Sequence, residues 1–142
     1  MPFAPAARRC LTLLSVPLCG IAVAACGTTL STGNYRGEQR AVAQTIANLQ
    51  ADVTAGEQKK VCANDVSATV VKRLGGTKGC ESTIKAQLGE IDNLETKIQS
   101  LEVGAGGKTA TVQVKTGYAG KPRLGTMSLV KEGSEWKISG VS

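Results

Sequence analysis

The side chains that could do chemistry in this sequence are five cysteines and a few carboxylates, because histidine is absent from all 142 residues. Ser/His/Asp and Cys/His nucleophilic arrangements both need an imidazole base, so these classes of hydrolase are excluded. No G-x-x-x-x-G-K loop is present to cradle a nucleotide phosphate. Asp52, Asp65 and Asp92 fall in expected helices or loops. We therefore predict no catalytic residue, no metal site and no cofactor.

The first 25 residues have the pattern of a secretory signal peptide. Arg8 and Arg9 form a positive start, residues 10–25 form a mostly apolar run, and two alanines precede Cys26. The run has 16 residues and contains Pro17, whereas about 20 apolar residues are needed to cross a bilayer. A signal that is removed therefore fits this pattern better than a permanent membrane-spanning helix.

The end of the apolar run, Val23-Ala24-Ala25-Cys26, resembles the lipobox of bacterial lipoproteins. The resemblance implies that a diacylglycerol is joined to the Cys26 thiol and that a peptidase cuts the chain before Cys26. The protein would then be held on the extracytoplasmic face of the cell membrane, because two acyl chains anchor a protein stably. The alternative is an ordinary signal peptide in which the cysteine is incidental.

Export also determines the state of the remaining thiols. With Cys10 and Cys19 removed and Cys26 alkylated, Cys62 and Cys80 are the pair left in the folded part. Outside the cytoplasm this pair would be oxidised, and a disulfide over this separation would stabilise the fold by about 3 kcal/mol. Two thiols without histidine do not make a zinc site, and a redox-active pair is normally spaced C-x-x-C. We therefore predict a structural disulfide.

The mature chain is long enough for one domain and only mildly basic. Removing the signal leaves 117 of the 142 residues, in which 15 basic residues face 11 acidic ones, a net charge of +4. Its aromatic residues are Tyr35, Tyr118 and Trp136. Proteins that bind nucleic acid usually have a basic stripe or an aromatic platform. Neither is visible here, so we predict no nucleic-acid partner.

The mature sequence begins with a tether and a long helix. Residues 26–36 are rich in Gly, Thr and Ser and have no apolar period, which is typical of a flexible linker. Residues 37–142 are then predicted to form a single domain. From Gly37 to Thr54 apolar residues recur at offsets of 0, 4, 7 and 11, which predicts an amphipathic helix. The residues of this stripe are Val42, Ile46, Leu49 and Val53.

Two or three short helices are expected next. Residues 57–63 could form the first, and Asn64 or Asp65 could cap a second that ends at Gly75-Gly76. A further helical segment is expected over residues 81–89. The predicted disulfide would then join the end of one short helix to the start of another.

After Leu94 the apolar period changes from 3.6 to 2, which indicates strands. Ile98 is out of step with Leu101 and Val103, so a bulge is expected in the first strand. Helices followed by a meander of about four strands predict an α+β fold, with the helices on one face of a curved antiparallel sheet. The expected strands are residues 96–103, 109–116 and 123–131, and a last one containing Trp136 and Ile138.

This order of elements, closing with Gly-Ser-Glu-Trp-Lys-Ile-Ser-Gly-Val at residues 133–141, is similar to the cone-shaped fold of the nuclear transport factor 2-like superfamily. It is similar in particular to small lipoproteins of high-GC Gram-positive bacteria. The resemblance implies an apolar cavity between the long helix and the sheet. Catalytic members use an Asp or His base inside it, a pattern from which this sequence departs. Candidate lining residues, which a packed core would also need, are Val42, Ile46, Val114, Met127 and Trp136.

These observations predict a membrane-anchored, non-catalytic domain that binds an envelope protein or another envelope component. The alternative is a carrier of a small apolar or lipid ligand in the cone. A weak isomerase or hydrolase is a third possibility, and it would need a buried titratable side chain in the cavity.

The anchor can be tested by Cys26→Ala. We expect this substitution to move the protein from the detergent phase to the aqueous phase in phase partitioning, because no thiol remains to carry the lipid. Unchanged partitioning would mean that an uncleaved signal holds the protein in the membrane.

Overall fold

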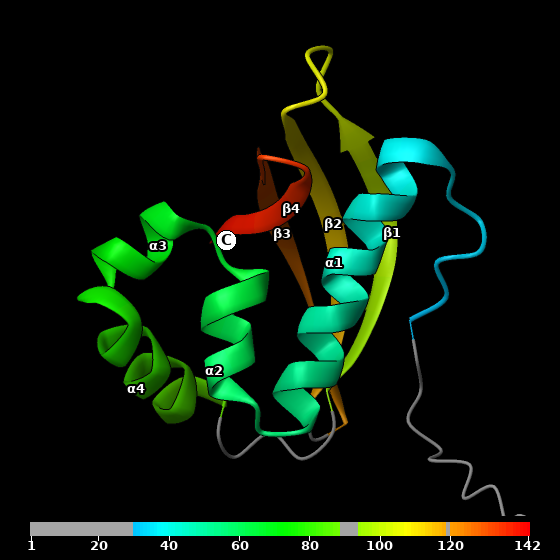
Figure 1. The fold of residues 1–142 in the computed structure, drawn as a ribbon. Helices are drawn as coiled ribbons and strands as arrows, with labels where there is room; N and C mark the ends of the chain where they lie inside the picture. Colours follow the sequence, from blue (N-terminus) through cyan, green and yellow to red (C-terminus); the bar gives the residue numbers. More distant parts are fainter. Residues whose placement is uncertain (1–29, 89–93, 119) are drawn as a thin grey trace, which may run out of the picture.

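The structure, a computed structural model, describes residues 30–88, 94–118 and 120–142. Helices come first and strands second in these residues, as Figure 1 shows. The helical part comprises α1 (Gly37–Thr54), α2 (Gln58–Lys60), the π-helix η1 (Val61–Asp65), α3 (Ala68–Arg73) and α4 (Gly76–Leu88). The strands are β1 (Glu95–Val103), β2 (Thr109–Tyr118), β3 (Lys121–Glu132) and β4 (Glu135–Val141).

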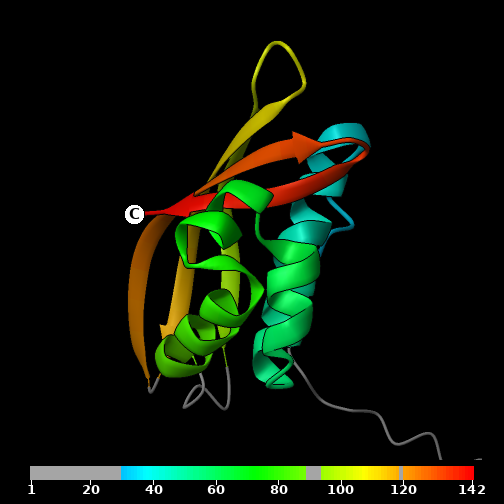
Figure 2. The same cartoon turned by 60° about the vertical axis from the view of Figure 1, so that its left-hand side comes forward.

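The four strands form one antiparallel sheet in the order β1-β2-β3-β4. The sheet is curved, α1 lies across one of its faces, and the shorter helices lie toward β4 (Figures 1 and 2). The predicted α+β class, with helices packed on a curved antiparallel sheet, is confirmed.

The core lies between α1 and the sheet. Val42 and Ile46 on α1 are 0% and 1% exposed, and they belong to one cluster with Val112 and Val114 of β2. Alternate residues of β2 point to this cluster, so Thr111 and Gln113 are left on the exposed face. The other members of the buried cluster are Ala110, Met127, Leu129, Trp136 and Ile138.

The irregularity predicted in β1 is confirmed. The register of β1 against β2 shifts between Ile98 and Ser100. As a result, Ile98, Leu101 and Val103 are all opposite the core residues of β2. The extra residue puts Ile98 on the same face as the other two, which strict alternation would not allow.

The predicted cap of the third helix is wrong. Ser67, and not Asn64 or Asp65, precedes α3, and its side chain accepts a hydrogen bond from the Val70 amide at 3.3 Å. The physical reason is that Val66 is drawn into an isolated parallel bridge with Ile138 of β4. The backbone therefore becomes extended before it can re-enter a helix.

The predicted start of the last helix is also wrong. Helix α4 begins at Gly76, directly after the turn that ends α3, so Cys80 lies inside it. Gly79 permits this close approach, because a Cβ at this position would lie 1.9 Å from the carbonyl oxygen of Leu74. The sequence pattern placed the start of this helix after Gly79-Cys80, whereas Gly79 lies inside its first turn as a packing requirement.

The last part of the predicted tether packs on the domain. Leu30 is half-buried against the core cluster, and the Tyr35 amide donates to the Thr32 carbonyl oxygen at 3.2 Å. Residues 30–36 thus run along the domain up to the start of α1 (Figure 1).

The first turn of α1 is fixed to the β3–β4 hairpin by a polar cluster. Glu38 accepts a hydrogen bond from Trp136 Nε1 at 2.7 Å and pairs with Lys131 Nζ at 2.5 Å. Lys131 also lies 5.9 Å from the centre of the Trp136 ring. The hydrogen bonds from Lys131 and Trp136 lower the pKa of the Glu38 carboxyl. This cluster sets where α1 begins along the sheet.

Ile46→Ala tests whether the space under α1 is packed. Removing a buried isoleucine should lower the free energy of unfolding by about 2–5 kcal/mol, measured by urea unfolding with Trp136 fluorescence as the signal. Gln44→Ala, on the exposed face of the same helix, is the matched control and should change it by about 0.5 kcal/mol or less. Equal, small effects of both substitutions would indicate that Ile46 borders a hollow.

Candidate functional site

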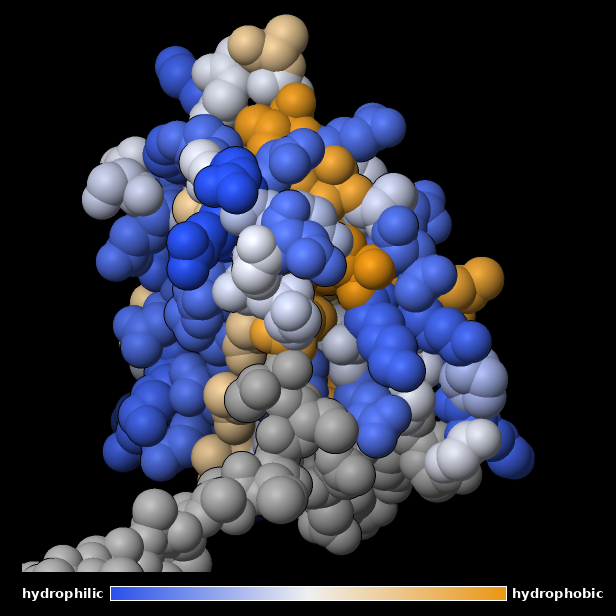
Figure 3. Space-filling view, turned by 90° about the vertical axis from the view of Figure 1, so that its right-hand side faces the viewer, coloured by the Kyte–Doolittle hydropathy of each residue, from blue (hydrophilic) through white to orange (hydrophobic). Residues whose placement is uncertain are grey.

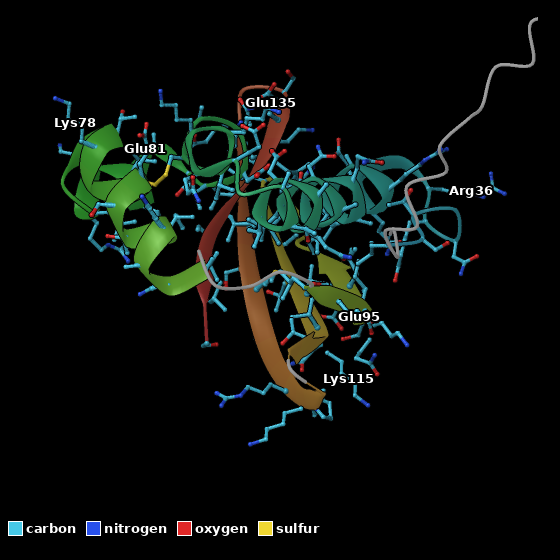
Figure 4. All side chains as sticks on the ribbon, turned by 90° about the horizontal axis from the view of Figure 1, so that it is seen from below. Arg36, Lys78, Glu81, Glu95, Lys115 and Glu135 are labelled. Carbon is cyan, nitrogen blue, oxygen red and sulfur yellow. A yellow bond between two sulfur atoms is a disulfide. The ribbon has the colours of Figure 1, made fainter. Side chains whose placement is uncertain are left out.

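The predicted disulfide is confirmed. Cys62 in η1 and Cys80 in α4 are joined, with an S–S distance of 2.03 Å and a Cα–Cα distance of 6.0 Å, and the bond is drawn in yellow in Figure 4. It ties the helical layer together beside the sheet. The proposed lipid attachment site, Cys26, lies outside the described residues.

The five residues predicted to line a pocket are brought together by the fold. Val42, Ile46, Val114, Met127 and Trp136 all belong to the buried core cluster. Trp136 also borders a surface groove, formed with residues of α1, η1 and β4.

The residue that sequence reasoning missed is Asp65, which it treated only as a possible helix cap. Asp65 is the last residue of η1 and is 2% exposed. Its Oδ2 atom is buried and has no hydrogen-bond partner in the part of the chain that the structure describes. A buried polar atom left unpaired costs about 1–3 kcal/mol. Asp65 is therefore the first candidate for a functional side chain.

The charges around Asp65 come from two other elements. Its pKa is raised from 3.8 to about 7, first because burial disfavours the charged form and second because the Asp52 carboxylate of α1 repels it. A side-chain hydrogen bond with Asp52 raises the pKa as well. Lys137 of β4 acts in the opposite direction. The carboxyl therefore holds its proton to a higher pH than an ordinary aspartate does. It can donate or accept a hydrogen bond, and it can exchange a proton with a bound group.

Asp65 is one of the residues that line a groove of about 420 Å³. Lys137, which is 8% exposed, donates to the Asn64 carbonyl oxygen at 2.5 Å and pairs with Glu135 at 2.7 Å. The hydrogen bond from Lys137 lowers the pKa of Glu135. We call this feature the Asp65 groove. Its walls are Ala41, Gln44, Thr45, Asn48, Asn64, Ser134, Glu135, Trp136 and Lys137.

The π-helix explains why Asp65 faces inward. The Val66 amide donates to the Val61 carbonyl oxygen at 3.1 Å, five residues back, so the turn is wider than an α-helical one. Single π-turns are often found at functional sites. The sequence signal was weak: Asn64-Asp65 stand between apolar residues, a pattern that a helix cap would also show.

A second groove follows the boundary between α1 and β1. Apolar side chains gather there in a seam between two hydrophilic flanks, as Figure 3 shows. At one end of the seam lies a groove of about 500 Å³, lined in part by Leu30, Tyr35, Thr96 and Ile98. The half-buried residues that pack on the core from this side are Leu30, Leu49, Ile98, Leu101 and Val103.

Neither a membrane span nor a metal site is seen in the described ranges 30–88, 94–118 and 120–142. No helix in these ranges is long and apolar enough to cross a membrane. They also contain no group of three or more Cys, Asp or Glu side chains placed to hold a metal ion.

Comparisons with known proteins give a fold and no family. No protein-family model matches the chain, and no curated protein matches it. The intermembrane space region of the chloroplast protein ARC6 is similar in structure, with a TM-score of 0.50 and 14% identity, over 76% of this chain and 97% of that chain. A designed protein with a curved β-sheet has a TM-score of 0.39 and 12% identity, over 46% of this chain and 61% of that chain. The ARC6 likeness supports the α+β architecture.

Asp65 should make the protein less stable as the pH rises. Its pKa is about 7 when folded and ordinarily 3.8, so between these values the folded state binds more protons than the unfolded state. The stabilisation of the folded state by protonated Asp65 is fully present below about pH 4 and is lost as the pH rises through about 7. The free energy of unfolding, measured with urea from about pH 5 to pH 8, should fall by up to a few kcal/mol in the unsubstituted protein. Asp65→Asn should make this fall smaller.

Glu102→Gln is the control, because Glu102 is an exposed carboxylate on β1. It should leave the slope of the free energy of unfolding against pH unchanged. If Asp65→Asn and the unsubstituted protein have the same pH slope, the carboxyl does not titrate in this range.

Proposed function

We propose that this protein is a membrane-anchored extracytoplasmic binding domain that takes a polar segment of an envelope protein into the Asp65 groove. The observation that carries the proposal is Asp65, which lines an open groove and whose buried Oδ2 atom has no hydrogen-bond partner among the described residues. A donor from a bound partner would recover the free energy that this unpaired atom costs.

The groove suits polar recognition better than burial of an apolar ligand. Asn48 and Asn64 offer amide groups on its walls, and Glu135 and Lys137 place opposite charges at its rim. The Trp136 ring is 3% exposed, so it supports the wall and offers little stacking surface. A peptide segment with main-chain and side-chain donors fits this set of groups.

The location rests on two other observations. Val23-Ala24-Ala25-Cys26 resembles a lipobox, and the Cys62–Cys80 disulfide is of the kind that forms and persists outside the cytoplasm. Both support export of the chain, and the first also supports its attachment to the membrane by a diacylglycerol on Cys26.

A second candidate function is a carrier of a small apolar or lipid ligand. The groove beside Leu30 and Ile98 favours it, because apolar side chains are half-exposed along the adjoining seam. Native mass spectrometry of protein purified from membranes would detect such a ligand as a stoichiometric adduct of a few hundred daltons, the size range of ligands that fill such pockets. A spectrum without an adduct would contradict this second function.

The Asp65 groove can be tested by photo-crosslinking in intact membranes. A photoreactive amino acid at Asn48, an exposed residue on the groove wall, should give one discrete protein adduct. The same residue at Thr69, exposed on α3 and outside the groove, should not give it. Asp65→Ala should remove the adduct at position 48.

Folding of the Asp65→Ala protein is checked by its Cys62–Cys80 disulfide and its melting temperature. If positions 48 and 69 give the same adducts, or if Asp65→Ala leaves the adduct intact, the groove is not the binding site.

A further inference from the structure

One end of the sheet, where β1 begins and β2 connects to β3, carries four basic side chains. They are Lys97, Lys115, Lys121 and Arg123, and all four are exposed. None of them lies within 4.0 Å of a carboxylate in the described part of the chain. We call this surface, together with Leu124, the basic end.

Two anionic groups of the described residues must be counted against these cations. Glu95 is close by, with its Cβ 3.8 Å from where a Cβ on Gly117 would lie, and Figure 4 shows it with Lys115 in the view from below. The second is the carboxylate of Ser142, whose backbone forms hydrogen bonds with that of Thr126, near Leu124. Among the described residues, the four cations exceed these two groups in number.

Strand pairing places like charges and an apolar side chain in one row. Lys97 is directly opposite Lys115, and Lys115 is directly opposite Leu124. Like charges directly opposite each other destabilise a sheet. Leu124 is 75% exposed, more than the other exposed large apolar residue, Val141 at 68%. Such a row is unfavourable in water, but cations around an apolar side chain are what an anionic lipid surface binds.

The path of the chain brings this end toward the membrane. Leu30 borders a groove together with Glu95, Lys97 and Ile98, the first residues of β1. Cys26 is only four residues before Leu30, a span of at most about 14 Å when fully extended. A lipid on Cys26 would therefore hold the bilayer surface close to the basic end.

We propose that the basic end is the face of the domain that rests on the anionic headgroups of the membrane, with Leu124 at headgroup level. This inference rests on the proposed lipid anchor at Cys26, and it adds an orientation. The turn of residues 104–108 lies at the opposite end of β1 and β2 and points away from the bilayer. No residue of the basic end lines the Asp65 groove, which stays open to a partner.

The orientation can be measured with tryptophan fluorescence on the full chain, purified with its lipid and reconstituted into vesicles of phosphatidylglycerol and brominated phosphatidylcholine. Trp136 is 3% exposed and gives a constant background. A tryptophan introduced by Leu124→Trp should be quenched by the brominated lipid. Ala105→Trp, exposed at the far turn about 20 Å along the sheet, should keep its fluorescence.

The dependence on charge has a matched control. Lys115→Gln with Arg123→Gln, added to Leu124→Trp, should remove most of the quenching, as should vesicles of phosphatidylcholine alone. Lys72→Gln with Arg73→Gln removes the same charge from α3 and should leave the quenching unchanged.

Two results would overturn the proposal in distinguishable ways. Equal quenching at positions 124 and 105, or quenching at 124 that is independent of lipid charge, contradicts the orientation while the anchor stands. A chain that leaves phosphatidylcholine vesicles as readily as its Cys26→Ala variant contradicts the anchor, and the orientation fails with it.

Discussion

The packing of α1 across the sheet is the interaction on which the rest of the structure depends. An antiparallel sheet of four strands needs one face covered, and Val42 and Ile46 cover it by fitting against Val112 and Val114. Glu38, held by Lys131 and Trp136, fixes where the helix begins. Once α1 is placed, its far end determines where the short helices must start. Their path back toward β4 then creates the Asp65 groove.

The path of the chain from η1 back to β4 leaves the Asp65 Oδ2 atom buried without a hydrogen-bond partner among the described residues, which costs free energy. The chain leaves η1, joins the edge of β4 through Val66 and the Ser67 amide, which donates to the Ile138 carbonyl oxygen at 2.9 Å, and only then forms α3. The wide turn of η1 leaves Asp65 facing inward, near the charges of Asp52 and Lys137. Buried groups of this kind are often retained for binding or proton transfer. The proposed binding role uses the unpaired oxygen directly.

The two proposed contacts of the protein use different parts of the domain. The basic end gathers Lys97, Lys115 and Leu124 on three neighbouring strands near the point where the chain enters the domain. The Asp65 groove lies between α1, η1 and β4. A domain resting on its basic end would leave this groove free. With the proposed lipid on Cys26, the few residues before Leu30 would restrict the orientation of the domain as well as its distance from the membrane.

The sequence by itself determined the local features. Apolar periods located α1 and the strands, the displaced Ile98 indicated the bulge, and the count of cysteines predicted the pairing of Cys62 with Cys80. Each of these depends on residues close in the chain or on simple elimination. The prediction that Asn64 or Asp65 caps the helix was wrong because Val66 forms a β-bridge with Ile138, more than 70 residues away. Only the tertiary structure brought Asp52, Asp65 and Lys137 together, because burial and charge act through space and leave no period in the sequence.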